Sequence, residues 1–232
     1  MITSLNVNAD WLDTIKDITG SAGDSSSSND TSLTNSDIAG AFKDALTIGS
    51  DNVVSQLSAP GGFNTDSNIR IPLPDSLQSV KKALDTVGMG DSLTDLEYKL
   101  NEAAESATKN AKPLFLNAIQ EMTWTDAQEI LNGPDDSATQ YFKNKMSEPL
   151  AESMKPIVDE SLNDVGAINS YNQVMSNYDD IPFAPDVQAN LTDHVLDKGI
   201  DGIFYYLAQE EKAIRENPAK RTTDLMKKVF AD

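Results

Sequence analysis

The stretch TDHVLDKGIDGIFYYL, residues 192–207, decides the fold that this sequence predicts. Its apolar residues and one glycine recur at steps of three and four, at Val195, Leu196, Gly199, Ile200, Ile203, Phe204 and Leu207. Because an α-helix turns once every 3.6 residues, this spacing places all of these positions on one face. The stretch therefore predicts an amphipathic helix packed on a core, with Thr192 as its N-cap.

The same spacing recurs along most of the remaining chain. It predicts helices over residues 38–57, 77–87, 93–107, 114–122, 127–131, 138–145, 150–162, 168–175 and 225–230. Predicted helix-end signals are Gly88, Ser92 with Asp95, Pro113, Thr125 and Gly166.

Strand signals are thin. Only NIRIPLP, residues 68–74, alternates, and its two prolines indicate an extended loop instead. A second proline-rich loop is predicted over YDDIPFAPD, residues 178–186. We therefore expect an all-α fold, an irregular bundle of about eight to ten helices with short proline-rich extended loops.

Domain organisation follows from a change in composition near residue 34. SAGDSSSSNDTSLT, residues 21–34, is small, polar and acidic, and offers almost nothing to bury. We expect residues 1–34 to be a flexible N-terminal segment with a short helix near Trp11, and residues 35–232 to form a single helical domain.

Composition excludes several classes of partner and site. The 232 residues carry 18 basic and 37 acidic side chains, a net charge of −19, which repels nucleic-acid phosphates. The chain has no cysteine, no apolar run long enough for a membrane span, and no signal peptide in the given sequence. Nucleotide-binding glycine motifs are missing, and we expect no cofactor.

Ionisable residues leave several readings open. The one histidine, His194, shares a predicted helix face with Lys198, Asp201 and Tyr205, as a catalytic dyad or as an ordinary surface residue. Weak calcium binding by Asp179, Asp180 and Asp186 is a further alternative, although the calcium-loop pattern D-x-D-x-D-G is missing. The sequence leaves open whether any metal binds.

Basic residues gather near the C-terminus, at Lys212, Arg215, Lys220, Arg221, Lys227 and Lys228. They predict either an anion-binding or acidic-partner surface, or internal pairs with neighbouring acids. Arg70 lies between two isoleucines in the first proline-rich loop, where an arginine pairs internally or with a ligand anion.

Several strings together resemble one bacterial family. They are ALTIGSDNVVSQLSAPGGF (45–63), IRIPLPDSLQSV (69–80), LNGPDDSATQYF (131–142) and the stretch from PFAPDVQANLTDHV to DLMKKVF (182–230). The resemblance is to the exported bacterial proteins catalogued as domain of unknown function 4197, and it implies a periplasmic or extracellular location. The family supplies no catalytic set. Its matching polar positions are the candidate ligand-binding residues: Arg70, Asp135, Asp136, Gln140, Tyr141, Asp193, Arg221, Thr222 and Asp224.

The function that these observations favour is a non-enzymatic envelope or extracellular binding or interaction module for a small molecule or a protein. Two alternatives remain: a hydrolase that uses loop carboxylates, and a structural or assembly subunit. The hydrolase alternative predicts two facing acids in a concave site, one of them with a raised pKa. The candidate polar positions also fit helix caps and buried pairs that hold the bundle.

Overall fold

A computed structural model describes residues 34–86, 88–181 and 187–216. Its helices are α2 (Asn35–Leu57), α3 (Asp75–Thr86), α4 (Asp91–Thr108), the 3-10 helix η1 (Lys109–Ala111), α5 (Lys112–Glu121), α6 (Trp124–Leu131), α7 (Ser137–Asp164), α8 (Ala167–Asp179) and α9 (Leu191–Glu216). The described residues contain helices and no strand, which confirms the all-α prediction. Because α4, η1 and α5 form one uninterrupted run, these residues hold seven separate helical segments, somewhat fewer than the predicted eight to ten.

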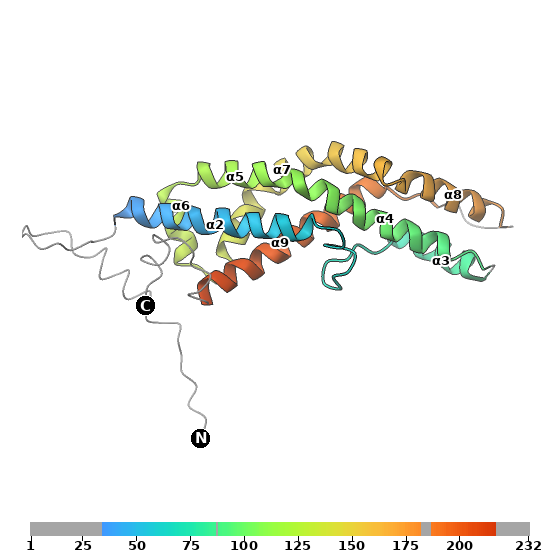
Figure 1. Cartoon of the computed structure of the whole chain (residues 1–232), viewed down its shortest axis with the longest axis horizontal. Helices are drawn as coiled ribbons and strands as arrows, with labels where there is room; N and C mark the ends of the chain where they lie inside the picture. Colours follow the sequence, from blue (N-terminus) through green and yellow to red (C-terminus); the bar gives the residue numbers. More distant parts are fainter. Residues whose placement is uncertain (1–33, 87, 182–186, 217–232) are drawn as a thin grey trace, which may run out of the picture.

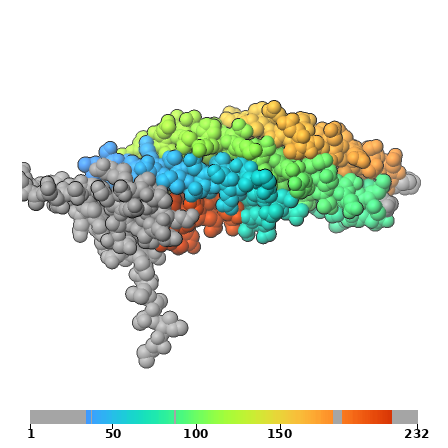
Figure 2. Space-filling view, viewed as in Figure 1, coloured from blue at the N-terminus to red at the C-terminus, as the bar shows by residue number. Residues whose placement is uncertain are grey.

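The helices form an elongated bundle whose long axis most of them follow (Figure 1). α9 packs against α7, α2 and α4, so it runs through the middle of the packing as the opening stretch of sequence predicts. α2, α5 and α6 occupy one end of the bundle, and α3 and α8 occupy the other. Figure 2 shows the same order on the molecular surface, from α2 at one end to α3 and α8 at the other.

The predicted apolar stripes form the core. Every residue of the stripe on α9, from Val195 to Leu207, is buried, and the apolar faces of the other described helices join it in one hydrophobic cluster. Phe115 of α5 lies at its centre, edge-on to Phe142 of α7 and to Phe204 of α9, with ring centroids 5.9 and 6.3 Å apart. Burying such aromatic side chains supplies much of the hydrophobic stabilisation.

One predicted gap lies inside α7 instead of separating two helices. The sequence predicted helices over residues 138–145 and 150–162, and α7 continues through the gap, which contains Pro149. Pro156 also lies inside α7, and each proline lacks a backbone donor. The helix continues through both because Leu150, Met154 and Val158 stay buried against its neighbours. Tertiary packing of that apolar face outweighs the local cost of the prolines.

Three predicted helix caps were wrong. Thr123, and not Thr125, caps α6, since it accepts a bond from the Asp126 amide while the Asp126 carboxylate accepts from Thr123. α9 begins at Leu191, and Asn190 Oδ1 accepts from the Asp193 amide 3.0 Å away, so Asn190 takes the capping role expected of Thr192. α4 begins at Asp91 without a side-chain cap.

Other local predictions are confirmed. Gly166 separates α7 from α8 with a φ of 74°, a left-handed conformation that glycine adopts without steric cost. Gly88 follows α3 with a φ of 78°. Pro113 lies in the first turn of α5, where its missing amide is not needed. Residues 70–74 belong to no helix or strand, and the extended conformation expected of residues 68–74 stays a prediction. Of the second predicted loop, Tyr178 and Asp179 belong to α8, and residues 182–186 lie outside the described residues.

Candidate functional site

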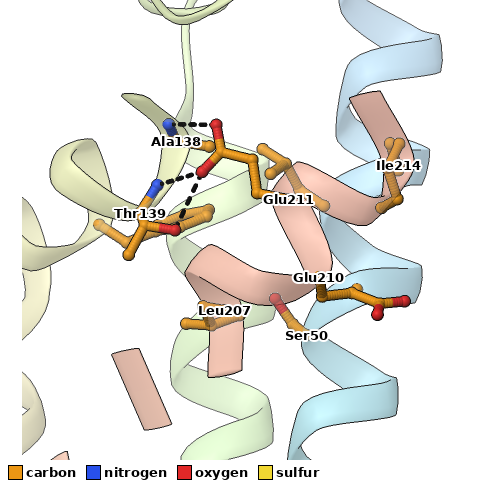
Figure 3. A pocket seen from close by; sticks show the side chains of 11 residues that line it. Ser50, Ala138, Thr139, Leu207, Glu210, Glu211 and Ile214 are labelled. Atoms are coloured by element: carbon orange, nitrogen blue, oxygen red, sulfur yellow. Dashed lines mark hydrogen bonds between the residues drawn. The ribbon is translucent and has the colours of Figure 1, made fainter. Parts of the chain in front are cut away.

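A buried carboxylate on α9 meets the first turn of α7. The side chain of Glu211 is 7% exposed, and it accepts hydrogen bonds from the Ala138 amide, the Thr139 amide and the Thr139 hydroxyl, each 2.9 Å long (Figure 3). Those amides are among the donors that a helix N-terminus leaves without partners. Asp136, the N-cap residue itself, makes no capping bond. A residue 72 positions away in the sequence therefore caps α7.

Arg215 completes this arrangement from the next turn of α9. One guanidinium nitrogen donates to Glu211 Oε1 at 2.9 Å and to the Ile130 carbonyl at 3.0 Å. Ile130 lies at the C-terminal end of α6, where the helix dipole favours a cation, just as the N-terminus of α7 favours an anion. The Glu211–Arg215 ion pair thus connects α9 to the end of α6 and the start of α7. Both charges therefore have a structural role.

A small hollow adjoins Glu211. We call it the α2–α9 hollow, and it is lined by Ala45, Leu46, Gly49, Ser50, Ala138, Thr139, Phe142, Leu207, Glu210, Glu211 and Ile214 (Figure 3). Its volume of about 20 Å³ is room for a single water molecule. The Ser50 hydroxyl is buried and has no hydrogen-bond partner among the described residues. Such a space does not admit an organic ligand.

A second buried polar centre on α4 holds the connection between α2 and α3. Glu105 accepts bonds from the backbone amides of Gly61, Phe63 and Asn64 at 3.0–3.2 Å. Asn101, one turn earlier, bonds both the amide and the carbonyl of Ile71, at 2.8 and 2.9 Å. The loop also has backbone hydrogen bonds of its own, such as Thr65 N–H to the Gly61 carbonyl, and the two side chains bind further backbone groups of it, which is again a structural use.

α9 holds the same connection from its other side. The Tyr206 hydroxyl donates to Asp66, and this bond raises the pKa of Tyr206 to about 12 and lowers the pKa of Asp66. His194 Nε2 lies 2.7 Å from the Pro72 carbonyl oxygen. Since a carbonyl only accepts, the imidazole donates there, so this ring nitrogen holds the loop.

The candidate residues that lie in described segments fall into separate places. Asp136 accepts from Gln140 at 3.1 Å, and Tyr141 follows on the same first turns of α7. Arg70 pairs with Glu97 of α4 at 2.8 Å. Asp193 pairs with Lys155 at 2.5 Å. Lys155 is 15 residues beyond Gln140 on α7, about 22 Å along the helix axis.

The structure therefore brings Asp136, Gln140 and Tyr141 together and places Arg70 and Asp193 elsewhere. Asp135 is exposed in the turn before α7. Burial and the nearby Asp126 carboxylate raise the pKa of Tyr141. Arg221, Thr222 and Asp224 lie outside the described residues. Ligand binding by this set of nine stays a prediction.

The hydrolase alternative predicts a carboxyl group with a raised pKa. Three carboxyl groups have shifted pKa values, and all three are lowered: Asp66 by the Tyr206 hydroxyl, Asp95 by Lys99, and Asp126 by the Thr123 amide. A general acid needs the opposite shift. Within the described residues no group of three or more metal-ligating side chains occurs, and of the calcium candidates Asp186 lies outside them.

A second hollow lies beside α8. We call it the α8 hollow; it is open to solvent, has a volume of about 640 Å³, and is lined by Ile168, Tyr171, Asn172, Gln188, Ala189, Asn190, Leu191 and Thr192. No lining residue is charged, although 24% of the chain is. The Tyr171 hydroxyl accepts from the Ala189 amide at 3.2 Å, which ties α8 to the segment before α9.

Some polar side chains that line the α8 hollow form hydrogen bonds within the protein, and others do not. Asn190 caps α9 and Thr192 donates to Asp159, so both are occupied by the fold. The amide side chains of Asn172 and Gln188 are exposed and make no hydrogen bond to other described residues. Each retains donors and an acceptor for a ligand.

Comparison with known proteins gives one result. A family model described as "Protein of unknown function (DUF4197)" matches residues 32–231. The chain belongs to the DUF4197 family. Searches of curated proteins and of solved structures returned no match. The DUF4197 match confirms the resemblance found in the sequence, and export of this chain stays a prediction. Among the described helices, none is long and apolar enough to cross a membrane.

The DUF4197 helices contain buried polar residues that sequence reasoning missed, above all Glu105 and Glu211. Arg215 was among the basic residues for which internal pairing with an acid was one of the two alternatives, and it pairs with Glu211. A signal for Glu211 was present, since it follows Leu207 by four residues and so continues the apolar stripe of α9. Glu105 likewise lies between the buried Ala104 and Ala107. A charge inside an apolar stripe predicts a buried, paired charge.

Proposed function

We propose that this DUF4197 chain is a non-enzymatic binding module of the bacterial envelope or extracellular space, with the α8 hollow as its ligand site. The observation that carries the proposal is the uncharged lining of this hollow in a protein with a net charge of −19. Its volume is in the range of known small-molecule sites. The proposed location rests on the family resemblance alone.

The chemistry of the lining favours a neutral, hydrogen-bonding ligand. A charged ligand needs an opposite charge to offset its desolvation, and none lines the hollow. Asn172 and Gln188 offer amide groups on two sides, while Ile168 and the Tyr171 ring offer apolar surface between them. Amides beside apolar surface suit a sugar or an uncharged peptide.

A binding role is also supported by the way the fold uses its buried acids. Glu105 accepts three hydrogen bonds and Glu211 accepts four from within the protein. Neither is oriented toward the α8 hollow, and no described acid lines it. The hydrolase and assembly alternatives have no comparable observation in their favour.

The proposal is tested by nuclear magnetic resonance with a panel of neutral oligosaccharides and uncharged peptides. We expect saturable shifts in the amide signals of Tyr171, Asn172 and Gln188, with the ligand recovered unchanged. The double variant N172A/Q188A should lose these shifts. Q173A, which changes an exposed amide on the same helix outside the lining, should keep them.

Three results would contradict the proposal. Consumption of the ligand would show turnover, and saturable shifts confined to other surfaces would move the site. The third is equal binding of the panel to N172A/Q188A and to the unaltered chain, which would show that Asn172 and Gln188 do not form the ligand site.

A further inference from the structure

One tyrosine connects the two sides of the α8 hollow. The Tyr171 hydroxyl accepts from the Ala189 amide at 3.2 Å, so the tyrosine side chain extends from α8 to the segment before α9. Tyr171 is half-buried, and the part that remains accessible lines the hollow. A tyrosine side chain has only two rotatable bonds, and the hydrogen bond at its far end restrains both. The hollow therefore presents a fixed aromatic ring to a ligand.

Two side-chain amides flank this tyrosine. Asn172 follows Tyr171 on α8, and Gln188 precedes Ala189 in the segment before α9, so the amides belong to the two sides that the tyrosine connects. Each side-chain amide can donate and accept. In a planar trans amide of a ligand, the N–H and the C=O point in opposite directions. One ligand amide between the two sides can therefore donate to one side chain and accept from the other, over a wider gap than a single hydroxyl oxygen can.

Apolar side chains lie beside these amides. Ile168 is four residues before Asn172, so the two share a face of α8, and Ile168 and Ala189 both line the hollow. A methyl group of a ligand can pack on these two side chains while an adjacent amide pairs with Asn172 and Gln188. Methyl and amide together are an acetamido group, which is neutral, as the uncharged lining requires.

Peptides also carry amides, but the described residues do not provide the usual means of binding one. They contain no strand whose edge could pair with an extended peptide, and the lining has no charged residue for a peptide terminus. Tyr171 is the single aromatic residue of the lining, whereas a groove for a polyproline segment has several. A sugar ring instead needs one aromatic face, because its C–H groups pack on the negative face of the π system.

We propose that the α8 hollow binds a neutral oligosaccharide of N-acetylated amino sugars, with a sugar ring against Tyr171 and its acetamido group between Asn172 and Gln188. This inference rests on the proposed binding function of the same hollow and names the class of its ligand. Because the hollow is open to solvent, the ligand can be part of a longer sugar chain that extends beyond the protein.

The test compares chitotetraose with cellotetraose, which has the same backbone and linkage but a hydroxyl in place of each acetamido group. In titrations followed by nuclear magnetic resonance, chitotetraose should shift the side-chain amide signals of Asn172 and Gln188 saturably. Its affinity should exceed that of cellotetraose by at least about tenfold, the effect of one or two hydrogen bonds. Saturation transferred from the protein should be strongest at the acetyl methyl protons of the sugar.

Two variants and one further sugar sharpen the comparison. N172D replaces the amide donor with a carboxylate of the same shape and should weaken chitotetraose binding by at least about tenfold. Q173E adds the same charge at an exposed position of α8 outside the lining and should leave the affinity unchanged. A tetrasaccharide of alternating N-acetylglucosamine and N-acetylmuramic acid keeps the acetamido groups but adds carboxylates. It should bind more weakly than chitotetraose, because no cation lines the hollow.

The outcomes separate this inference from the proposed function. Equal affinities for chitotetraose and cellotetraose, preferential binding of an uncharged peptide, or tighter binding of the acidic tetrasaccharide would overturn the assignment of the ligand, while the hollow would remain a binding site. Equal loss of chitotetraose affinity in N172D and Q173E would also overturn it. If no neutral sugar or peptide shifts the signals of the hollow, both this inference and the proposed function are contradicted.

Discussion

At the scale of the residue, the buried carboxylates act on backbone amides. Glu211 caps α7 from a distant helix, and Glu105 binds three backbone amides of the α2–α3 connection. Such charge-assisted bonds offset the cost of burying an acid, and they leave no free carboxylate for other chemistry. The burial of these two acids is therefore explained by the backbone amides that donate hydrogen bonds to them.

The first prediction concerns Glu211. E211Q should lower the free energy of unfolding by about 2–4 kcal/mol, because it removes a buried charge that accepts three bonds and leaves Arg215 without its counter-ion. The measurement is urea unfolding followed by circular dichroism. E216Q is the control: Glu216 is paired with Lys212 at the surface at 3.8 Å, and its loss should change stability by less than about 0.5 kcal/mol. Equal stabilities of the two variants would contradict the structural role.

The second prediction concerns pH. The bond to Asp66 raises the pKa of Tyr206 to about 12, above its ordinary value near 10. A raised folded pKa gives stability that is present below pH 10 and is lost as pH rises toward 12. Y206F should therefore be less stable at pH 8 and should lose less stability between pH 10 and pH 12. Y205F, the neighbouring exposed tyrosine, should keep the steep alkaline loss; the same slope in all three proteins would argue against the Asp66 bond.

At the scale of the element, apolar periodicity predicted the helices and failed at their ends. Stripes such as Leu93, Leu96 and Leu100 repeat over several turns, so one misplaced residue does not hide them. Caps depend on a single side chain, and neighbouring candidates such as Thr123 and Thr125 look alike in sequence. The predicted gap before Leu150, which contains Pro149, was wrong because long-range packing maintains α7.

Long-range contacts also limit prediction of the candidate site. The α8 hollow joins residues of α8 to a segment before α9, and Glu211 reaches α7 across 72 positions. Neither pairing leaves a local pattern in the sequence. Arg70 was predicted to pair, and its partner Glu97 could be named only from the fold.

The third prediction compares two threonines. T123A should destabilise the protein by about 1 kcal/mol, because it removes the reciprocal cap of α6. T125A should change stability by less than about 0.5 kcal/mol, since Thr125 is exposed and has no capping bond. Thermal unfolding of both variants at one pH shows which threonine caps α6. A larger effect of T125A would identify Thr125 as the N-cap and contradict the assignment to Thr123.

The fourth prediction compares two glycines of α9. A Cβ at Gly202 would lie 2.8 Å from Phe63 Cε1, so G202A should destabilise by about 1–3 kcal/mol through overpacking. A Cβ at Gly199 would meet only Ala104 Cβ at 3.9 Å, and G199A should stabilise by up to about 1 kcal/mol through helix propensity. Denaturant midpoints measure both, and a stabilised G202A would contradict the close packing of α9 on Phe63.

At the scale of the whole molecule, the buried ion pair of Glu211 and Arg215 and the α8 hollow lie far apart. Leu191, at the start of α9, lines the hollow, and Glu211 is 20 residues later on the same helix, about 30 Å along its axis. Figure 1 shows α8 at one end of the bundle and α6 at the other. Sites separated in this way respond independently to substitution.

We therefore propose that the buried charges stabilise the fold and that the uncharged α8 hollow binds the ligand. The most direct test measures unfolding free energy and ligand affinity in E211Q and N172A/Q188A, with a neutral ligand that binds the unaltered chain. We predict that E211Q loses stability and keeps its affinity, while N172A/Q188A keeps stability within about 0.5 kcal/mol and loses its affinity at least tenfold. Loss of affinity in a folded E211Q, with full affinity in N172A/Q188A, would contradict the claim.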